Sequence, residues 1–234
     1  MQSNNDGASR LFLSADLVGS TARKQSSLTG WLGDVLGFYQ QFPVMVADNF
    51  EVAKGAYPED LDGEPPQPKL WKAVGDELIF FCDIRDEHHV RLAIKGFVAA
   101  LPAWSRDGLP QKDALPLKGG GWIATFPLPD RAVAVVADPG ALGPDLFDVG
   151  RVPEHNNRTL LSAVDDNAHP DIVWMDFVGP SMDTGFRLLN HATPRRFMLS
   201  LEAAWLYAQA AGSAADDLYL EGEIQMKGVW GGRG

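Results

Sequence analysis

The sequence lacks the features that mark several large classes of protein. Only one of its 234 residues, Cys82, is a cysteine, so no internal disulfide can form and the disulfide-stapled secreted proteins are excluded. No run of about 18 apolar residues occurs, and residues 1–9 contain neither a basic nor an apolar segment that would resemble a signal peptide. The sequence therefore predicts a soluble, cytoplasmic protein.

Positive charge is also scarce. The chain has 20 Lys and Arg against 31 Asp and Glu, for a formal net charge of −11, and the basic residues form no run. Binding to nucleic acid or to a membrane surface depends on a basic face that releases counterions, so neither partner is expected. A phosphate ligand is not excluded, because bound metal ions can supply positive charge locally.

The pattern of apolar residues predicts an α+β fold. We expect strands at 10–18, 70–74, 78–82, 122–126, 132–137, 172–178, 197–201 and 218–226. We expect helices at 31–50, with a possible bend at Pro43, at 90–101, ending before Pro102, at 183–192 and at 202–210. This order predicts one ferredoxin-like domain over 1–234, with a mixed or antiparallel sheet and helices packed on it. Segment 127–170, rich in Pro, Gly, Asp and Asn, is interpreted as an insertion before the late strand.

Two groups of residues invite a functional interpretation that the sequence does not support. The glycine triplet 119–121 lacks the Gly-Lys-Ser/Thr ending of a phosphate-binding loop, so a turn or bulge before a strand is expected. His88 and His89 stand beside acidic residues at the start of a helix, where a solvated helix end explains them better than a metal site does.

Two aspartates are the strongest candidates for chemistry. Asp16 ends an apolar strand, and Asp76 lies in the tight turn of a hairpin. If the two strands are neighbours, the carboxylates converge and repel one another unless a cation lies between them, which favours a hard divalent metal. Taken singly, each aspartate has an ordinary explanation, as a helix cap or as a turn residue.

The segments around both aspartates resemble the class III nucleotidyl cyclases. LFLSADLVGSTARK at Leu11–Lys24 is similar to the family's first metal-binding strand, and LWKAVGDELIFF at Leu70–Phe81 to its second. Residues 171–200 resemble more loosely the late strand and helix that carry the transition-state residues, and Met226–Val229 is similar to a motif near the family's C-terminus. The resemblance implies a class III cyclase domain.

The resemblance also implies roles for individual residues. Asp16 and Asp76, with the backbone carbonyl of Leu17, would hold two Mg²⁺ or Mn²⁺ ions. Lys72 matches a lysine that reads the base in many adenylate cyclases, and Asp183 matches the acidic residue that shares this reading.

The transition-state motif departs from the family's Asn and Arg spaced four residues apart. One register places Arg187 and His191 at these positions, where helical spacing would project them together onto a triphosphate. Asn190 and Arg195 offer a second register, in which Arg195 would contact the nucleotide.

The Gly-Phe-Arg variant and the insertion resemble the bacterial pyrimidine cyclases of Pycsar antiphage systems. The implied reaction makes cyclic UMP from UTP, with CTP as the second candidate, as a signal to an effector protein. Tyr57 could fill the space that a smaller base leaves. The resemblance further implies a head-to-tail homodimer, in which each active site takes its metal ligands from one chain and its base-reading and transition-state residues from the other.

Alternative functions remain open at this stage. The irregular late motif also fits a cyclase-like module that binds nucleotide without catalysis, and an adenylate cyclase is a further alternative. A cyclic-dinucleotide synthase would share the ferredoxin-like core, but its Gly-Gly-Asp/Glu-Glu-Phe signature is missing. A purely structural protein would leave the pair Asp16 and Asp76 unexplained.

Overall fold

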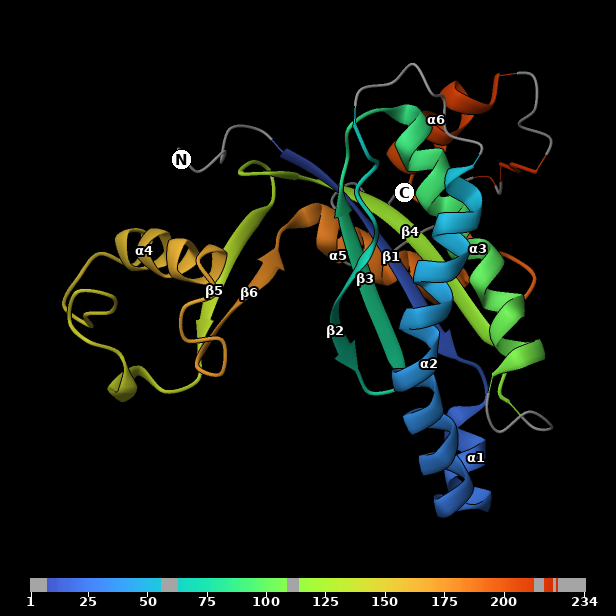
Figure 1. Ribbon diagram of the computed structural model, residues 1–234, viewed down its shortest axis with the longest axis horizontal. Coiled ribbons are helices and arrows are strands. Elements are labelled where there is room, and N and C mark those ends of the chain that lie inside the picture. Colours follow the sequence, from blue (N-terminus) through green and yellow to red (C-terminus); the bar gives the residue numbers. More distant parts are fainter. Residues whose placement is uncertain (1–7, 56–62, 109–113, 213–216, 221, 223–234) are drawn as a thin grey trace. The chain divides into compact units, whose positions relative to one another are not determined.

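The computed structural model describes residues 8–55, 63–108, 114–212, 217–220 and 222 (Figure 1). The chain divides into two compact units. The large unit comprises Ser9–Ala124 and Thr184–Gly234, and the small unit comprises Met1–Ala8 and Thr125–Asp183. The segment 127–170, expected as an insertion, therefore lies within the small unit, and the assignment of all 234 residues to one cyclase domain stays a prediction.

A five-stranded sheet forms the centre of the large unit, in the order β2-β3-β1-β4-β7. Its strands are β1 (Ala8–Leu17), β2 (Lys69–Val74), β3 (Glu77–Asp83), β4 (Leu117–Phe126) and β7 (Met198–Leu199). β3 runs antiparallel to both β1 and β2, whereas β4 and β7 are parallel. The predicted α+β fold with a mixed sheet is confirmed.

Helices cover one face of this sheet. They are α2 (Leu28–Lys54), α3 (Glu87–Asp107) and α6 (Leu201–Ala211), of which α2 and α3 lie side by side, while the short helix α1 (Ser20–Ser26) packs against α2 (Figure 1). Because side chains alternate along a strand, β1 directs every second residue into the core beneath these helices. The β1 residues in this core are Leu11, Leu13, Ala15 and Leu17. They are buried among Phe38 and Phe42 of α2 and Phe97 of α3.

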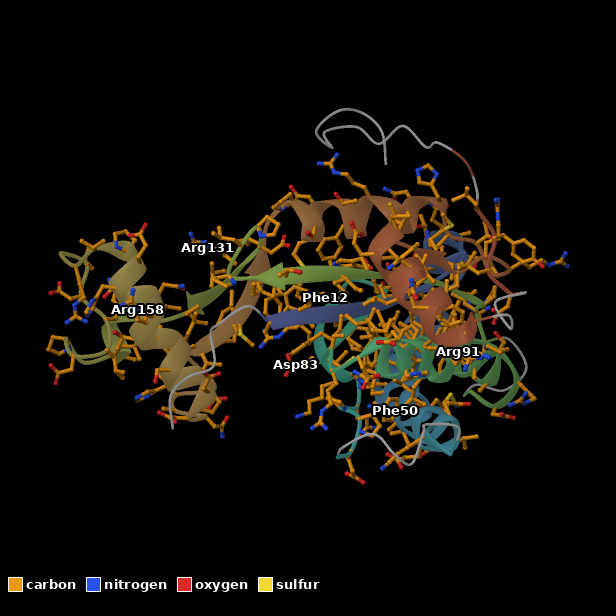
Figure 2. The ribbon with its side chains drawn as sticks, turned by 90° about the horizontal axis from the view of Figure 1, so that it is seen from above. Phe12, Phe50, Asp83, Arg91, Arg131 and Arg158 are labelled. Atoms are coloured by element: carbon orange, nitrogen blue, oxygen red, sulfur yellow. The ribbon has the colours of Figure 1, made fainter. Side chains whose placement is uncertain are left out.

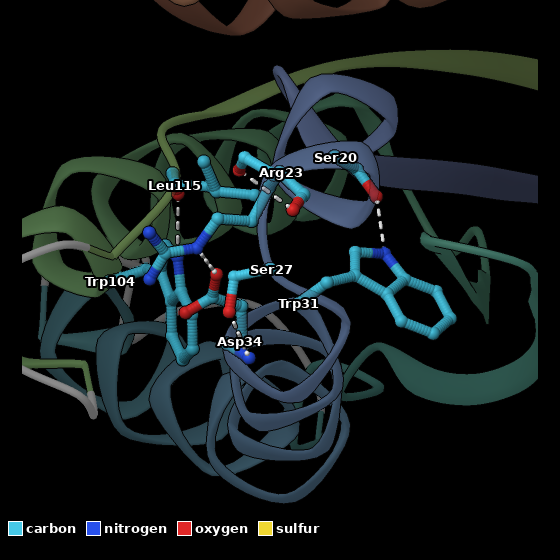
Figure 3. Close-up of polar contacts among 9 residues, drawn as sticks. Ser20, Arg23, Ser27, Trp31, Asp34, Trp104 and Leu115 are labelled. Carbon is cyan, nitrogen blue, oxygen red and sulfur yellow. Dashed lines mark hydrogen bonds and ion pairs between the residues drawn. The ribbon is translucent and has the colours of Figure 1, made fainter.

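Two helices continue through a proline. α2 contains Pro43, and α3 runs through Pro102 to Asp107, so the prediction that this helix ends before Pro102 is wrong. Proline in a helix interior costs about 3 kcal/mol, and burial beyond it offsets this cost. Trp104 is fully buried, and its Nε1 donates a hydrogen bond of 3.0 Å to the carbonyl of Leu115 (Figure 3).

The glycine triplet lies inside β4, and the expected turn before the strand is wrong. A Cβ atom on Gly119 would lie 2.3 Å from the carbonyl oxygen of Ser14, and one on Gly120 would lie 2.8 Å from that of Met198. Side chains at these positions would collide with the backbone of both neighbouring strands. Close approach of strands, rather than a turn, accounts for the glycines.

The small unit has its own sheet and helix. β5 (Arg131–Val136) pairs antiparallel with β6 (Val173–Val178), and α4 (Pro153–Asp165) packs on both. The sequence analysis missed α4 because Asn156 occupies one of its three buried positions, so apolar residues alone do not mark its inner face. Asn156 donates through Nδ2 to the carbonyl of Asp148 and accepts from its N–H, which satisfies this buried amide.

The C-terminal third differs in detail from expectation. The predicted helix 183–192 is α5 (Pro180–Leu188) followed by a 3₁₀ turn, η2 (Leu189–His191), and the predicted strand 197–201 shrinks to β7. Of the expected strand 218–226, residues 218–220 are not a strand and residue 222 has no regular structure, while the others lie outside the described residues. None of the helices in the described part of the chain is long and apolar enough to cross a membrane.

His89 is fully buried, which corrects the expectation of a solvated helix end. Its Nε2 lies 2.7 Å from the carbonyl oxygen of Pro66, so Nε2 carries the proton, and Nδ1 accepts from the N–H of Arg85 at 3.4 Å. Burial lowers the pKa of His89 below its ordinary value of 6.5, although the Pro66 carbonyl and Asp86 oppose the shift. The neutral ring therefore fits this site.

We expect His89 to make the fold less stable in acid. The unfolded chain binds a proton at His89 near pH 6.5 while the folded chain resists it, so the contribution of His89 is present above that pH and declines below it. Urea unfolding of the wild type and His89→Gln at about pH 5 and about pH 7.5 measures this difference. The free energy of unfolding of the wild type should exceed that of His89→Gln by less at the lower pH. A difference that is constant, or that grows in acid, would contradict the prediction.

Candidate active site

Strand pairing brings Asp16 and Asp76 to the same end of the sheet. β1 and β3 are neighbours, with Asp16 opposite Glu77 in the register. The N–H of Leu17 donates a hydrogen bond of 3.2 Å to the carbonyl oxygen of Asp76. The end of β1 is therefore tied directly to the turn between β2 and β3, and a cluster of carboxylates forms at this point.

The acidic cluster lies on the sheet face opposite the α2 and α3 core. Alternation along β1 places Phe12, Ser14 and Asp16 on this face. The hydroxyl of Ser14, which is fully buried, donates a hydrogen bond to Oε1 of Glu77. This contact fixes the Glu77 side chain beside Asp16.

Lys118 supplies the positive charge of the cluster. Its Nζ lies 3.1 Å from Oδ2 of Asp16, and both side chains are about three-quarters buried, with exposed fractions of 28% and 25%. Burial raises the pKa of Asp16, an effect that Lys118 opposes and Asp76 reinforces. Burial likewise raises the pKa of Glu77, against the hydrogen bond from Ser14. The site thus concentrates negative charge in a partly desolvated position.

Sequence reasoning missed Lys118, although a signal for it was present. Lys118 directly precedes the glycine triplet, which was interpreted as a turn. Had the glycines been assigned to a strand packed closely on β1, Lys118 would have fallen beside Asp16, since Gly119 lies against Ser14.

The oxygen donors of the cluster fit a magnesium or manganese ion. In the described part of the chain, no three His, Cys, Asp or Glu side chains gather closely enough to hold a metal by themselves. Mg²⁺ in phosphate-processing sites is typically held by one or two carboxylates together with substrate phosphates. Asp16 and Asp76 supply such a pair, and the Leu17 carbonyl belongs to the same strand end.

Tyr39 of α2 holds the turn that carries Asp76. Its hydroxyl donates a hydrogen bond to the carbonyl oxygen of Gly75. Burial and the negative charge of Asp76 raise the pKa of Tyr39, so the phenol stays protonated and remains a donor. Tyr39, which the sequence analysis did not identify, is therefore placed to fix the position of Asp76.

The end of α5 packs on the sheet face that carries Asp16. Trp122 of β4 stacks on Phe12 at 5.5 Å between ring centroids, and the ring of Phe186 lies 5.4 Å from Trp122. A Cβ on Gly185 would lie 2.2 Å from the Trp122 ring, so only glycine permits this packing. Arg187, which is half-buried, follows directly in α5.

The residues predicted to act beside Arg187 lie beyond α5. Asn190 and His191 are exposed in η2, and Arg195 is exposed in the following turn. A 3₁₀ helix has about 3.0 residues per turn instead of about 3.6, so Arg187 and His191 do not share the α-helical face that was expected. In the described part of the chain, no hydrogen bond or ion pair joins these four side chains to the acidic cluster.

The remaining predicted residues fall in three different places. Lys72 lies on β2 with its Nζ 3.8 Å from the centroid of the Trp71 ring, a cation–π contact. Asp183 is exposed in the first turn of α5 and belongs to the small unit. Tyr57 and the motif Met226–Val229 lie outside the described residues.

Comparison with known proteins identifies the fold. No family model matches the sequence, and no curated protein does. Solved structures do match, among them the guanylate cyclase domain of RhGC from Catenaria anguillulae in complex with GTP, with a TM-score of 0.57 and 10% identity over 97% of this chain and 94% of that one.

Two other cyclases give similar results. The guanylyl cyclase Cya2 matches with a TM-score of 0.51 and 13% identity over 96% of this chain and 88% of that chain. The adenylyl cyclase CyaB from P. aeruginosa matches with a TM-score of 0.51 and 11% identity over 97% and 92%. Identities this low establish the fold alone. The chain therefore has the fold of the class III nucleotidyl cyclases.

Proposed function

We propose that the chain is a nucleotidyl cyclase that converts a pyrimidine nucleoside triphosphate, UTP in preference to CTP, into the 3′,5′-cyclic monophosphate and pyrophosphate. The observation that carries the proposal is the acidic cluster, in which Asp16 and Asp76 meet at one end of the sheet and Lys118 neutralises Asp16. A cluster of this kind suits a polyphosphate bound with divalent cations.

Asp16, Asp76 and the Leu17 carbonyl would hold the two Mn²⁺ or Mg²⁺ ions. When bound, such ions activate a hydroxyl nucleophile and neutralise triphosphate charge. The Asp16 carboxylate, whose pKa burial raises, is stabilised in its charged form by positive charge nearby. Without bound metal ions, Lys118 supplies the positive charge that stabilises the Asp16 carboxylate. When metal ions take over this role, Lys118 is available to contact phosphate oxygens of a bound substrate.

The proposed reaction is an intramolecular phosphoryl transfer. The ribose 3′-oxygen forms a bond to the α-phosphorus, the bond from that phosphorus to the bridging oxygen of the β-phosphate breaks, and pyrophosphate leaves. The proton of the 3′-hydroxyl passes to water. Arg187 is assigned to stabilise the negative charge that develops on the phosphoryl oxygens. Asn190 or His191 would make the second contact, and Arg195 would be a further phosphate ligand.

The pyrimidine preference rests on the resemblance of the Gly-Phe-Arg segment and on hydrogen-bond polarity. Uracil presents an acceptor at O4 and a donor at N3, and cytosine reverses both. Lys72 facing O4 would favour UTP, with Asp183 sharing the recognition of the base and Tyr57 filling the space beside it. A site that satisfies one pattern leaves buried groups unpaired against the other, which discriminates strongly.

The proposed active unit is a head-to-tail homodimer. Arg187 makes no hydrogen bond or ion pair with the acidic cluster in the described part of the chain, as expected if it serves the cluster of a partner chain. The cyclic nucleotide would then act as a second messenger to an effector in antiphage defence.

A product assay tests this function. Purified protein is incubated separately with ATP, GTP, CTP and UTP in the presence of Mn²⁺, and products are separated and identified by mass. Cyclic UMP as the main product is expected. Cyclic AMP or cyclic GMP as the main product would refute the pyrimidine assignment, and cyclic CMP would refute only the choice of uracil. Nucleotide binding without any cyclic product would favour the inactive sensing module, which the irregular late motif also fits.

We expect Tyr39→Phe to weaken the metal site without abolishing turnover. The change removes one hydrogen bond, worth about 0.5–1.5 kcal/mol, between the phenol and the Gly75 carbonyl. The half-saturating Mn²⁺ concentration should rise by about 2- to 10-fold, with a smaller change in kcat. Tyr219→Phe, at a position that is 82% exposed, is the matched control. An unchanged Mn²⁺ requirement in Tyr39→Phe would exclude a positioning role.

A further inference from the structure

The small unit contains a pocket that the proposed cyclase reaction does not use. Its volume is about 910 Å³, within the range of about 300–1,000 Å³ that is typical of sites for small molecules. β5, α4 and the loop between them form the walls, and all of the lining residues belong to the small unit. Most are apolar, among them Phe126, Phe147, Val149, Leu160, Leu161 and Val178.

The polar amides in the pocket wall are already occupied. Oδ1 of Asn157 accepts a hydrogen bond of 2.8 Å from the N–H of Ala134, and its Nδ2 donates to the carbonyl of Ala132 at 3.2 Å. These bonds tie α4 to the free edge of β5. The wall is therefore preformed, and Asn157 has little capacity left for a ligand.

Two arginines at the pocket do have such capacity. Arg131 begins β5 and Arg158 lies on α4; both line the pocket and both are exposed (Figure 2). In the described part of the chain, neither guanidinium makes a hydrogen bond or an ion pair. Arg151, also in the lining, differs because its guanidinium donates to the carbonyls of Asp145 and Pro144.

The pocket lining is net positive, whereas the whole protein is net negative. The chain carries a net charge of −11, so it repels anions in general. Within the pocket lining, Glu154 is the one acidic residue against three arginines. A guanidinium beside apolar walls pairs well with a carboxylate or phosphate, which it can bind through two parallel hydrogen bonds.

We propose that this pocket binds an amphipathic anion, a molecule with an apolar body and a carboxylate or phosphate head group. The apolar body lies against the side chains of β5 and α4, and the head group pairs with Arg131 and Arg158. Nothing in this proposal depends on the cyclase reaction, because every residue that carries it belongs to the small unit.

The test is a fluorescence titration of the full chain with 8-anilinonaphthalene-1-sulfonate, an amphipathic anion, followed by competition. One saturable site per chain is expected, from which decanoate and decyl phosphate displace the dye. Decanol, which has the same apolar body without a charge, should compete at least about tenfold more weakly. Stronger displacement by decyl phosphate would assign a phosphate head group, and stronger displacement by decanoate a carboxylate. Equal competition by decanol, or no saturable site, would overturn the proposal.

Variants at exposed positions test the residues without endangering the fold. The double variant Arg131→Gln, Arg158→Gln should bind the dye and decanoate at least about tenfold more weakly, while Arg106→Gln, an exposed arginine of the large unit, should leave binding unchanged. Val149 lines the pocket and is 87% exposed, so charge can be added there directly. Val149→Glu should weaken binding and Val149→Lys should strengthen it. Affinities that do not change in these variants would show that the dye binds elsewhere.

Discussion

Replacing Asp16 by Asn should reduce cyclase activity by about 100-fold or more. The substitution keeps the shape of the side chain and removes the charge that a divalent cation requires. Metal coordination supplies several kcal/mol of transition-state stabilisation, and each 1.36 kcal/mol corresponds to about a tenfold change in rate. Initial rates of cyclic nucleotide formation at saturating Mn²⁺ and nucleotide measure the effect. Asp76→Asn should behave in the same way, because Asp76 is joined to the same strand end through Leu17.

Loss of activity in Asp16→Asn should not result from unfolding. Burial raises the pKa of Asp16, which means that the folded chain disfavours the charged carboxylate relative to the unfolded chain. A neutral side chain is therefore tolerated, and the midpoint of thermal unfolding should not fall substantially.

Asp83→Asn provides the matched control for both variants. Asp83 lies on the same pair of strands, opposite Arg10 at the other end of the register, and forms an exposed ion pair with it at 2.7 Å. Exposed pairs contribute about 0–1 kcal/mol, so Asp83→Asn should remain active. Near-normal activity of Asp16→Asn in a metal-dependent assay would exclude the assigned metal site.

The parts of the fold predicted correctly were those with a strong local pattern. β1 and β3 have continuous apolar runs, and the Gly75–Asp76 turn between β2 and β3 is a clear hairpin signal, so these strands and the hairpin followed from the sequence. The convergence of Asp16 and Asp76 was expected only on the condition that their strands are neighbours, and the pairing of β1 with β3 meets that condition. Local pattern and tertiary contact agree here, which is why prediction succeeded.

The parts that were missed depend on contacts between distant segments. Lys118 acquires its role from Asp16, 3.1 Å away across the sheet, and the glycines beside it are explained by the strands packed on them. His89 is buried because Pro66 and Arg85 satisfy its two ring nitrogens, which a helix-end pattern does not reveal. Helix α4 was missed because Asn156 occupies a buried position on its inner face. In each case, a polar residue is buried through a partner that the local sequence does not identify.

Mixing two inactive variants should restore part of the cyclase activity. If each active site takes its acidic cluster from one chain and Arg187 from the other, Asp76→Asn and Arg187→Ala disable opposite halves of the site. Random exchange makes half of the dimers mixed, and each mixed dimer has one intact site of two, so about one quarter of wild-type specific activity should return. The two proteins are incubated until subunits exchange, and cyclic nucleotide formation is compared with that of each variant alone.

A mixture of Asp16→Asn with Asp76→Asn separates true complementation from any other effect of mixing. Both changes lie in the same acidic cluster, so every site in a mixed dimer keeps one damaged cluster and activity should stay at the level of the single variants. Formation of mixed dimers is verified by mass, with a different affinity tag on each variant. If mixed dimers of Asp76→Asn and Arg187→Ala form and remain inactive, Arg187 does not complete the cluster of a partner chain. The contact missing between Arg187 and Asp16 would then have to arise within a single chain when nucleotide binds.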